Sequence, residues 1–166
     1  MFEASLNESF ARISGDLKRG IILIADHARN ILPAEYGSLG LPPQQFERHI
    51  AYDIGVEAVT RGLASKLGCP ALLATFSRLL IDPNRGADDP TLIMRVSDGA
   101  IVPGNAHVDE TERERRLARF HRPYHAAIRA EVDAALAQGI DPLLVSIHSF
   151  TPFWKGIARP WHVGIL

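Results

Sequence analysis

The sequence predicts a single α/β domain over residues 1–166, with a mostly parallel central sheet flanked by helices. Three observations lead to this prediction. Short apolar runs alternate with helical segments, which is the pattern of parallel strands joined by right-handed crossovers. Two of the runs end in a histidine, and open α/β sheets bind their ligands at the carboxyl ends of the strands. The chain has 166 residues and is 46% hydrophobic, which is enough for one buried core.

The first half of the chain predicts a strand, a loop and a helix, in that order. Residues 21–26 form an apolar run and therefore a strand. Residues 27–46 contain too many prolines and glycines for a helix and predict a loop. In residues 46–67 the apolar side chains recur every three or four positions, which indicates an amphipathic helix. Gly68 is expected to end this helix.

A strand and a long irregular segment follow. Residues 70–76 predict a strand, and residues 79–81 form a second, shorter apolar stretch. Residues 82–104 are rich in Asp, Pro, Gly and Asn and predict a loop. Loops of this length inside a compact domain are usually functional or disordered.

A long helix is predicted over residues 109–138. Thr111 and Glu114 have the spacing of a capping box at its start, and Gly139 is expected to stop it. Pro123 lies inside the predicted helix and predicts a kink or a break into two helices.

The C-terminal part predicts two further strands. In residues 142–147 leucine and β-branched side chains follow one another, and Ser146 is the one polar residue, which indicates a buried strand. Residues 163–166 form another apolar run. Because chain ends are usually polar and loosely held, we expect a natural protein to continue beyond this point, so that a C-terminal part of the fold is missing.

Composition narrows the class of protein. The net charge of −1 favours neither nucleic acid nor an anionic membrane as a partner. No apolar run approaches the roughly 18 residues of a membrane-spanning helix, and the N-terminus lacks the layout of a signal peptide. Cys69 is the single cysteine, which excludes an internal disulfide and a cysteine-rich zinc site. We expect a cytoplasmic protein; the oligomeric state stays open, a homo-oligomer included.

Two histidines follow predicted strands, and they predict a metal or proton-transfer site. His27 follows the strand over 21–26 and His148 follows the strand over 142–147. A lone histidine is more often a hydrogen-bonded structural residue, but two at parallel strand ends favour ligation of zinc. Asn30 has the short spacing from His27 expected of a third ligand, although an amide oxygen binds zinc less well than a carboxylate. Asp26 is a stronger ligand type, but neighbours on a strand point to opposite faces.

The segment after the strand over 70–76 offers two arginines. Arg78 and Arg85 are separate candidates for binding a substrate carboxylate, because a guanidinium can hold both of its oxygens. Asn84 stands beside Arg85, and Asp82 can pair with either arginine. The alternative interpretation is an ordinary turn, since Asp-Pro-Asn-Arg-Gly is rich in turn formers.

The predicted helix over 109–138 offers charges and two histidines. Its arginines and glutamates alternate and are expected to form a solvated face with ion pairs. His121 and His125 have the i,i+4 spacing of a metal pair, but we expect them to serve packing.

Five motifs, in order along nearly the whole chain, resemble the N-formylglutamate amidohydrolase-like family, which is similar in turn to the zinc carboxypeptidases. They are Asp26-His27-Ala28-Arg29-Asn30-Ile31-Leu32-Pro33, Ser77-Arg78-Leu79-Leu80-Ile81-Asp82-Pro83-Asn84-Arg85, Ser97-Asp98-Gly99, Pro103-Gly104-Asn105 and Ser146-Ile147-His148-Ser149-Phe150-Thr151-Pro152. The resemblance implies a phosphorylase/hydrolase-like fold and zinc-dependent hydrolysis of an N-acyl amino acid such as N-formylglutamate, in amino-acid catabolism of the histidine-degradation kind.

The resemblance also implies roles for individual residues. Zn²⁺ is held by His27 and His148, with Asn30 standing where the carboxypeptidases have glutamate. Arg85, Asn84 and Ser149 bind the substrate, and Arg78 orients a second carboxylate or stabilises the oxyanion. The alternative is a non-catalytic binding module for an acidic small molecule on the same fold.

The general base is a separate question, since such families carry their catalytic glutamate in a Glu-x-Arg setting on a later strand that this chain does not contain. Glu35 is the best local candidate for the base. Glu47, Asp53 and Glu57 lie on or just before the first predicted helix, where we expect a solvated or capping role.

Overall fold

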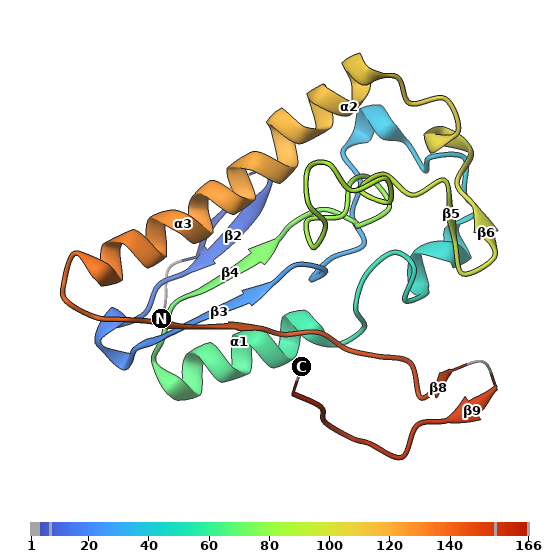
Figure 1. Ribbon diagram of the computed structural model, residues 1–166. Helices are drawn as coiled ribbons and strands as arrows, with labels where there is room; N and C mark the ends of the chain where they lie inside the picture. The colour runs from blue at the N-terminus through green and yellow to red at the C-terminus, as the bar shows by residue number, and fades with distance from the viewer. Residues whose placement is uncertain (1–3, 7, 155, 166) are drawn as a thin grey trace.

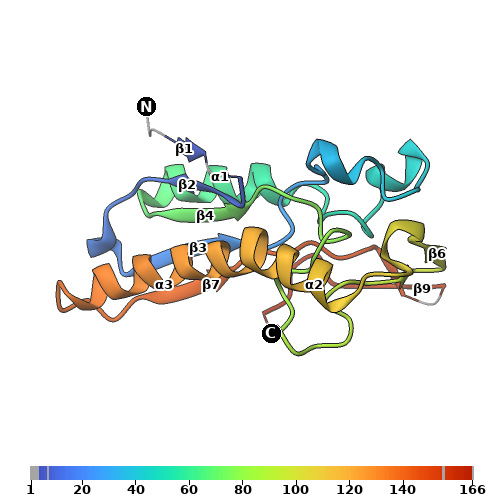
Figure 2. The same ribbon diagram turned by 90° about the horizontal axis from the view of Figure 1, so that it is seen from above.

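The central sheet has five strands and confirms the α/β class. We describe the chain from a computed structural model, over residues 4–6, 8–154 and 156–165. The strand order is β1-β2-β4-β3-β7, with β3 parallel to both of its neighbours and the N-terminal β1 and β2 antiparallel (Figures 1 and 2). The strands are β1 (Ala4–Leu6), β2 (Phe10–Ile13), β3 (Ile21–Ala25), β4 (Ala71–Ala74) and β7 (Leu143–Ser146).

Helices cover both faces of the sheet, as Figure 2 shows for α1 on one side and α3 on the other. Successive residues of β3 point to opposite faces, so that Ile24 packs in the core beneath α3 and Leu23 in the core beneath α1. Both are nearly fully buried. The continuous apolar runs of β3 and β4 are therefore explained by burial on both faces. The buried strand predicted over residues 142–147 is wrong in its burial, because β7 lies at the edge of the sheet and Leu143 and Leu144 are 62% and 42% exposed.

The first helix, α1 (Val56–Leu67), begins ten residues later than the sequence predicts. The preceding residues instead form a 3-10 turn (Pro43–Glu47) and an irregular segment up to Gly55, which has φ 83° and precedes the first helical turn. That segment is held against the end of β3, because the backbone N–H of Asp53 donates to the carbonyl of His27 at 2.9 Å. Gly68, with φ 66°, ends α1 as predicted.

The second helical region is broken near Pro123, as predicted. It consists of α2 (Glu110–Arg116), a π-turn (Leu117–His121) and α3 (Arg122–Leu136). Proline lacks a backbone N–H and its ring crowds the preceding turn, and the wider π-turn accommodates both effects. The predicted capping box is wrong, because Asp109 caps α2 and its side chain accepts from the N–H of Glu112 at 2.8 Å.

The remaining segments are short. Residues 82–104 are mostly irregular, as predicted, but contain a hairpin of β5 (Val96–Ser97) and β6 (Ala100–Ile101). A second hairpin, β8 (Phe153–Trp154) and β9 (Ile157–Ala158), lies near the C-terminus. The predicted strand over 163–166 is wrong for residues 163–165, which are exposed and form no strand, while Leu166 lies outside the described residues. Further 3-10 turns cover Leu17–Arg19, Ala34–Tyr36 and Pro103–Asn105.

No helix in the described part of the chain is long and apolar enough to cross a membrane.

Candidate metal centre

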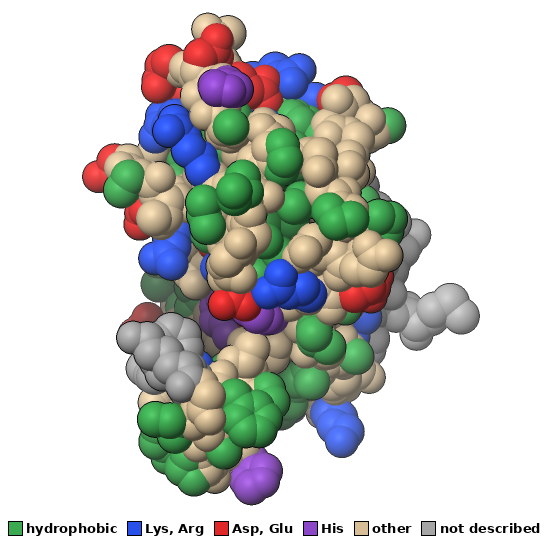
Figure 3. All heavy atoms as spheres, turned by 90° about the vertical axis from the view of Figure 1, so that its right-hand side faces the viewer, with side chains coloured by type: hydrophobic (Ala, Val, Ile, Leu, Met, Phe, Trp, Pro, Cys, Tyr) green, Lys and Arg blue, Asp and Glu red, His purple; other side chains and the backbone are tan. Residues whose placement is uncertain are grey.

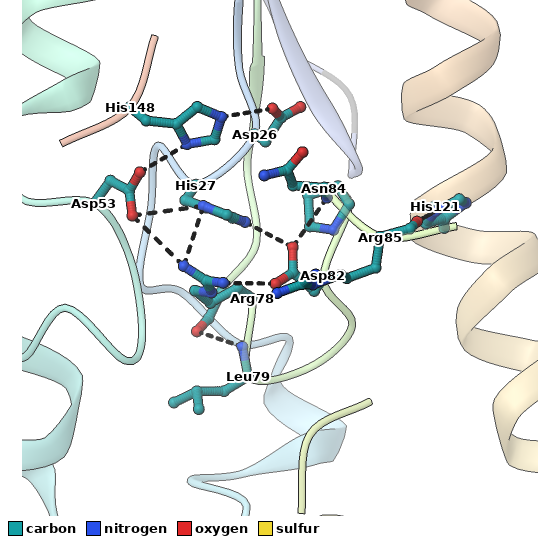
Figure 4. A network of polar contacts seen from close by, with 12 residues as sticks. Asp26, His27, Asp53, Arg78, Leu79, Asp82, Asn84, Arg85, His121 and His148 are labelled. Carbon is teal, nitrogen blue, oxygen red and sulfur yellow. Dashed lines mark hydrogen bonds and ion pairs between the residues drawn. The ribbon is translucent and has the colours of Figure 1, made fainter. Parts of the chain in front are cut away.

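Polar side chains meet where the parallel strands β3, β4 and β7 end. Asp26 and His27 follow β3, Arg78 and Asp82 lie in the segment after β4, and His148 follows β7. Figure 4 shows these residues in one network, and Figure 3 shows histidine side chains near the middle of one face, beside acidic and basic groups. The predicted meeting of His27 and His148 is confirmed, with their ring centroids 5.2 Å apart.

Asp53 lies between the two histidines. Its Oδ2 is 2.9 Å from Nδ1 of His148, and its Oδ1 is 3.5 Å from Nδ1 of His27. One potential ligand atom from each of the three residues lies within 4.8 Å of the other two. Two imidazoles and one carboxylate are a donor set used by catalytic zinc, which keeps a further position open. His27 and Asp53 are buried while His148 is exposed, so the centre is open on the side of His148.

Each histidine also has an outer partner for its second ring nitrogen. Nε2 of His27 is 2.6 Å from Oδ1 of Asp82, and Nε2 of His148 is 3.3 Å from Oδ2 of Asp26. Carboxylates in this position fix the tautomer and orientation of metal-binding histidines. In this network the Nδ1 atoms share protons with Asp53. A bound metal would replace these protons, with Nε2 still protonated toward the outer carboxylates and both Nδ1 atoms serving as ligands beside Asp53.

Asp26 is a buried outer residue. It accepts hydrogen bonds from the hydroxyls of Tyr124 and Ser146, both at 2.9 Å. Burial raises the pKa of Asp26, but the hydrogen bonds from His148, Tyr124 and Ser146 more than offset this effect and lower it below its ordinary value. Asp26 is therefore charged at neutral pH.

The centre carries more negative than positive fixed charge. Burial raises the pKa of Asp53, but hydrogen bonds from His148 and His27 lower it well below its ordinary value. Hydrogen bonds to Asp26 and Asp53 raise the pKa of His148 to about 9. Three carboxylates, those of Asp26, Asp53 and Asp82, face the single guanidinium of Arg78, so that the centre favours a cation, whether a proton or a metal ion.

Arg78 belongs to the network and pairs with Asp82. Its Nη2 donates to Oδ2 of Asp82 at 2.8 Å, and its Nη1 lies 3.3 Å from Nδ1 of His27 and 3.7 Å from Oδ1 of Asp53. Of the two pairings that the sequence left open for Asp82, this is the one that the structure contains. Nε of Arg78 is buried and has no hydrogen-bond partner among the described residues.

Two residues suggested by the sequence lie outside this network. The amide Nδ2 of Asn30 donates to the carbonyl of Phe46 at 2.8 Å and thereby holds the loop after β3. The carboxylate of Glu35 pairs with Nη1 of Arg119 at 2.5 Å on an exposed part of the surface. Ser149 reaches the centre through its backbone N–H, which lies 3.3 Å from Oδ2 of Asp53.

The solvated or capping role expected for Asp53 is wrong. Apolar periodicity extends the predicted helix back to residue 46, whereas the structure starts it at Val56 and leaves Asp53 only 6% exposed. The one local signal in the sequence was Gly55, since glycine readily adopts positive φ, here 83°, and is unfavourable inside a helix.

A cavity of about 430 Å³ adjoins the centre. Asp26 and Ser146 line one part of it, and the segment over 83–86, including Asn84 and Arg85, lines another. The side chain of Arg85 is 45% exposed, and its Nη1 lies 3.9 Å from Oδ2 of Asp89. Arg85 therefore has weakly engaged donors at the edge of the cavity.

These features define an α/β protein with a candidate metal centre at the ends of its parallel strands, next to a cavity with an arginine at its edge. The sequence profile of the N-formylglutamate amidohydrolase family matches residues 19–165. The chain belongs to this family, which confirms the resemblance found in the motifs.

Known proteins agree with this assignment. The chain is 33% identical over 97 residues to an N-formylglutamate deformylase of Pseudomonas putida, covering 52% of this chain and 36% of that protein. The crystal structure of gene product Atu2144 from Agrobacterium tumefaciens is similar with a TM-score of 0.86, 31% identity and coverage of 92% of this chain and 61% of that chain. The N-formylglutamate amidohydrolase of Ralstonia eutropha shares the fold, with a TM-score of 0.60, 24% identity and coverage of 86% and 58%. The chain thus spans only part of the length of these relatives.

Proposed function

We propose that this chain provides the metal-binding part of a zinc-dependent amidohydrolase that removes an N-acyl group, of the N-formyl type, from an acidic amino acid such as N-formylglutamate. The observation that carries the proposal is the arrangement of His27, Asp53 and His148 with an outer carboxylate behind each histidine. The similarity to the N-formylglutamate deformylase of Pseudomonas putida supports the choice of substrate.

The chemistry of the donor set fits zinc. Two neutral imidazoles and a carboxylate make up a three-ligand site, and the exposed side at His148 leaves room for substrate. Bound zinc would supply Lewis acidity, which polarises an amide carbonyl. Asp53 replaces Asn30 in our proposed ligand set, because a carboxylate binds zinc better than an amide oxygen. The carboxylate of Asp53 lies 2.9 Å from His148 and 3.5 Å from His27.

The residues around the centre would bind and orient the substrate. Arg85 presents weakly engaged guanidinium donors at the cavity, suited to the two oxygens of the α-carboxylate, with Asn84 beside it. Arg78 lies against His27 and Asp53, where its positive charge would stabilise negative charge that develops on the carbonyl oxygen. The backbone N–H of Ser149 donates to Oδ2 of Asp53 at 3.3 Å and would hold that ligand in place.

A non-catalytic binding module for an acidic small molecule is the second candidate. The carboxylates near the centre support this candidate, because a carboxylate that is already engaged is poorly placed to act as a general base. Asp26, Asp53 and Asp82 each accept hydrogen bonds, and Glu35 is paired with Arg119. A general base must be positioned to take a proton, and typically contributes about 10²–10⁴-fold to the rate.

Formate release distinguishes the two candidates. The zinc-loaded protein is incubated with N-formylglutamate, and formate is measured beside a matched His148→Ala sample. Zinc-dependent release that the variant lacks supports the hydrolase. Calorimetric binding of N-formylglutamate that depends on neither zinc nor His148, without any release, supports the binding module, and neither binding nor release contradicts both.

A further inference from the structure

The helix α3 and the π-turn before it contact the segment over 83–86 through two histidines. Nε2 of His121 lies 2.8 Å from the carbonyl oxygen of Arg85, and Nε2 of His125 lies 2.9 Å from the carbonyl oxygen of Pro83. A carbonyl oxygen only accepts, so both Nε2 atoms are protonated and donate. Figure 4 shows His121 on the helix next to Arg85. The two imidazoles are neighbours, with ring centroids 4.3 Å apart.

The same helix face also reaches the metal centre. Tyr124, between the two histidines in sequence, donates its hydroxyl to Asp26 at 2.9 Å. One rigid helix therefore contacts the end of β3 through Tyr124 and the segment over 83–86 through His121 and His125. The cavity lies between these contacts, and both histidines line it. π-turns are frequent at functional sites because they change the register of the side chains that follow.

The other end of the segment is held from the metal centre. Oδ1 of Asp82 accepts the N–H of Asn84 at 2.9 Å, and the backbone carbonyl of Asp82 accepts the N–H of Arg85 at 3.1 Å. The same Oδ1 lies 2.6 Å from Nε2 of His27. The backbone of the segment is thus fixed on both sides, by Asp82 and by the two histidines of the helical region, while the guanidinium of Arg85 stays at the cavity.

We propose that His121 and His125 are positioning residues that determine specificity for a carboxylate. By donating to the carbonyls of Arg85 and Pro83, they fix the backbone that carries the Arg85 side chain at a set place relative to the metal centre. A ligand then gains affinity from Arg85 only if its carboxylate can reach Arg85 while its acyl group lies at the metal. The separation of these two groups in the ligand must therefore match the separation of Arg85 and the metal centre. This inference rests on the proposed function and adds two residues to it, in place of the packing role that the sequence suggested.

The test compares donors and ligands in the zinc-loaded full chain. His121→Phe and His125→Phe, singly and together, keep a ring of similar size but remove the donor, whereas His121→Gln and His125→Gln keep an N–H donor. Affinity is measured by calorimetry for N-formylglutamate and for its α-amide, which lacks the charged α-carboxylate. His49→Phe is the matched control, since the His49 side chain is 44% exposed and lies 3.4 Å from Asp98, away from the segment over 83–86.

We expect the wild type to bind N-formylglutamate more tightly than its α-amide. In the double phenylalanine variant the ratio of these two affinities should fall by about tenfold, the effect of one lost charge-assisted hydrogen bond. The glutamine variants should retain most of it, and zinc content and the control should not change. An unchanged preference in the phenylalanine variants, or an equal loss for both ligands, would overturn the inference while the proposed function stands. If the wild type binds both ligands equally, carboxylate recognition by Arg85 is itself wrong. The single variants serve as the test if the double variant does not fold.

Discussion

Replacing Asp82 by asparagine should weaken zinc binding although Asp82 is not in the proposed ligand set. Asp82 is fully buried and accepts from three directions: His27 Nε2 at 2.6 Å, Arg78 Nη2 at 2.8 Å and the N–H of Asn84 at 2.9 Å. Asp82→Asn keeps the shape but removes the charge and turns one acceptor into a donor. The new amide N–H of the asparagine must face His27, Arg78 or the N–H of Asn84, each of which donates to Asp82 in the wild type. The tautomer of His27 with its proton on Nε2, which leaves Nδ1 free for the metal, is then no longer favoured.

The expected loss follows from the outer position of this carboxylate. Removing such a partner typically costs 10–100-fold in metal affinity, which is about 1.4–2.8 kcal/mol. The apo protein should also unfold more easily, because the variant leaves the partly buried charge of Arg78 without its closest partner.

The assay is competition for Zn²⁺ against a chelating indicator of known affinity, with Asp98→Asn as the matched control. Asp98 is an exposed aspartate paired with Arg48 at 2.8 Å, so the control removes the same charge from the surface and should leave zinc affinity unchanged. Equal zinc affinity in Asp82→Asn and the wild type would refute the role assigned to the outer carboxylate.

Three further outcomes follow from the structure. Arg85→Lys keeps the charge but loses the planar fork, and should weaken calorimetric binding of N-formylglutamate by about 1–3 kcal/mol without lowering the thermal midpoint; equal affinity would assign Asn84-Arg85 to an ordinary turn. Glu35→Gln should leave zinc binding and any formate release unchanged, because Glu35 is paired with Arg119 at the surface; a large fall in rate would restore Glu35 as the base. Burial raises the pKa of Glu112, but its hydrogen bonds with Arg115 and Arg116 lower it below its ordinary value. The charged Glu112 therefore stabilises the fold above the unfolded pKa of about 4.3, and this stabilisation is lost as the pH falls through the folded pKa. Glu112→Gln should lower the free energy of unfolding, measured in urea, at pH 7 and leave it unchanged at pH 2.

The strands and the two histidines could be predicted because their signals are local. A continuous apolar run indicates a strand, although only β3 and β4 are buried on both faces and β7 is largely exposed. Parallel strands bring their carboxyl ends to one edge of the sheet. Knowing β3 and β7 was therefore enough to place His27 beside His148.

Asp53 could not be predicted because a tertiary contact decides its conformation. The apolar spacing of residues 46–67 fits one continuous helix, but the bond from the N–H of Asp53 to the carbonyl of His27 holds the first part of that segment out of the helix. A periodicity rule has no access to such a contact between distant residues. The same limit applies to His121 and His125, whose partners are backbone carbonyls far away in sequence.

Metal analysis tests the central claim, that His27, Asp53 and His148 form one metal site, most directly. The chain is loaded with Zn²⁺, dialysed, and analysed for metal per chain, beside His148→Ala and Asp53→Asn proteins whose folding is checked by circular dichroism. We expect about one zinc per wild-type chain and a large loss in both variants. A wild-type chain that retains no divalent metal, or folded variants that retain zinc as tightly as the wild type, would contradict the claim.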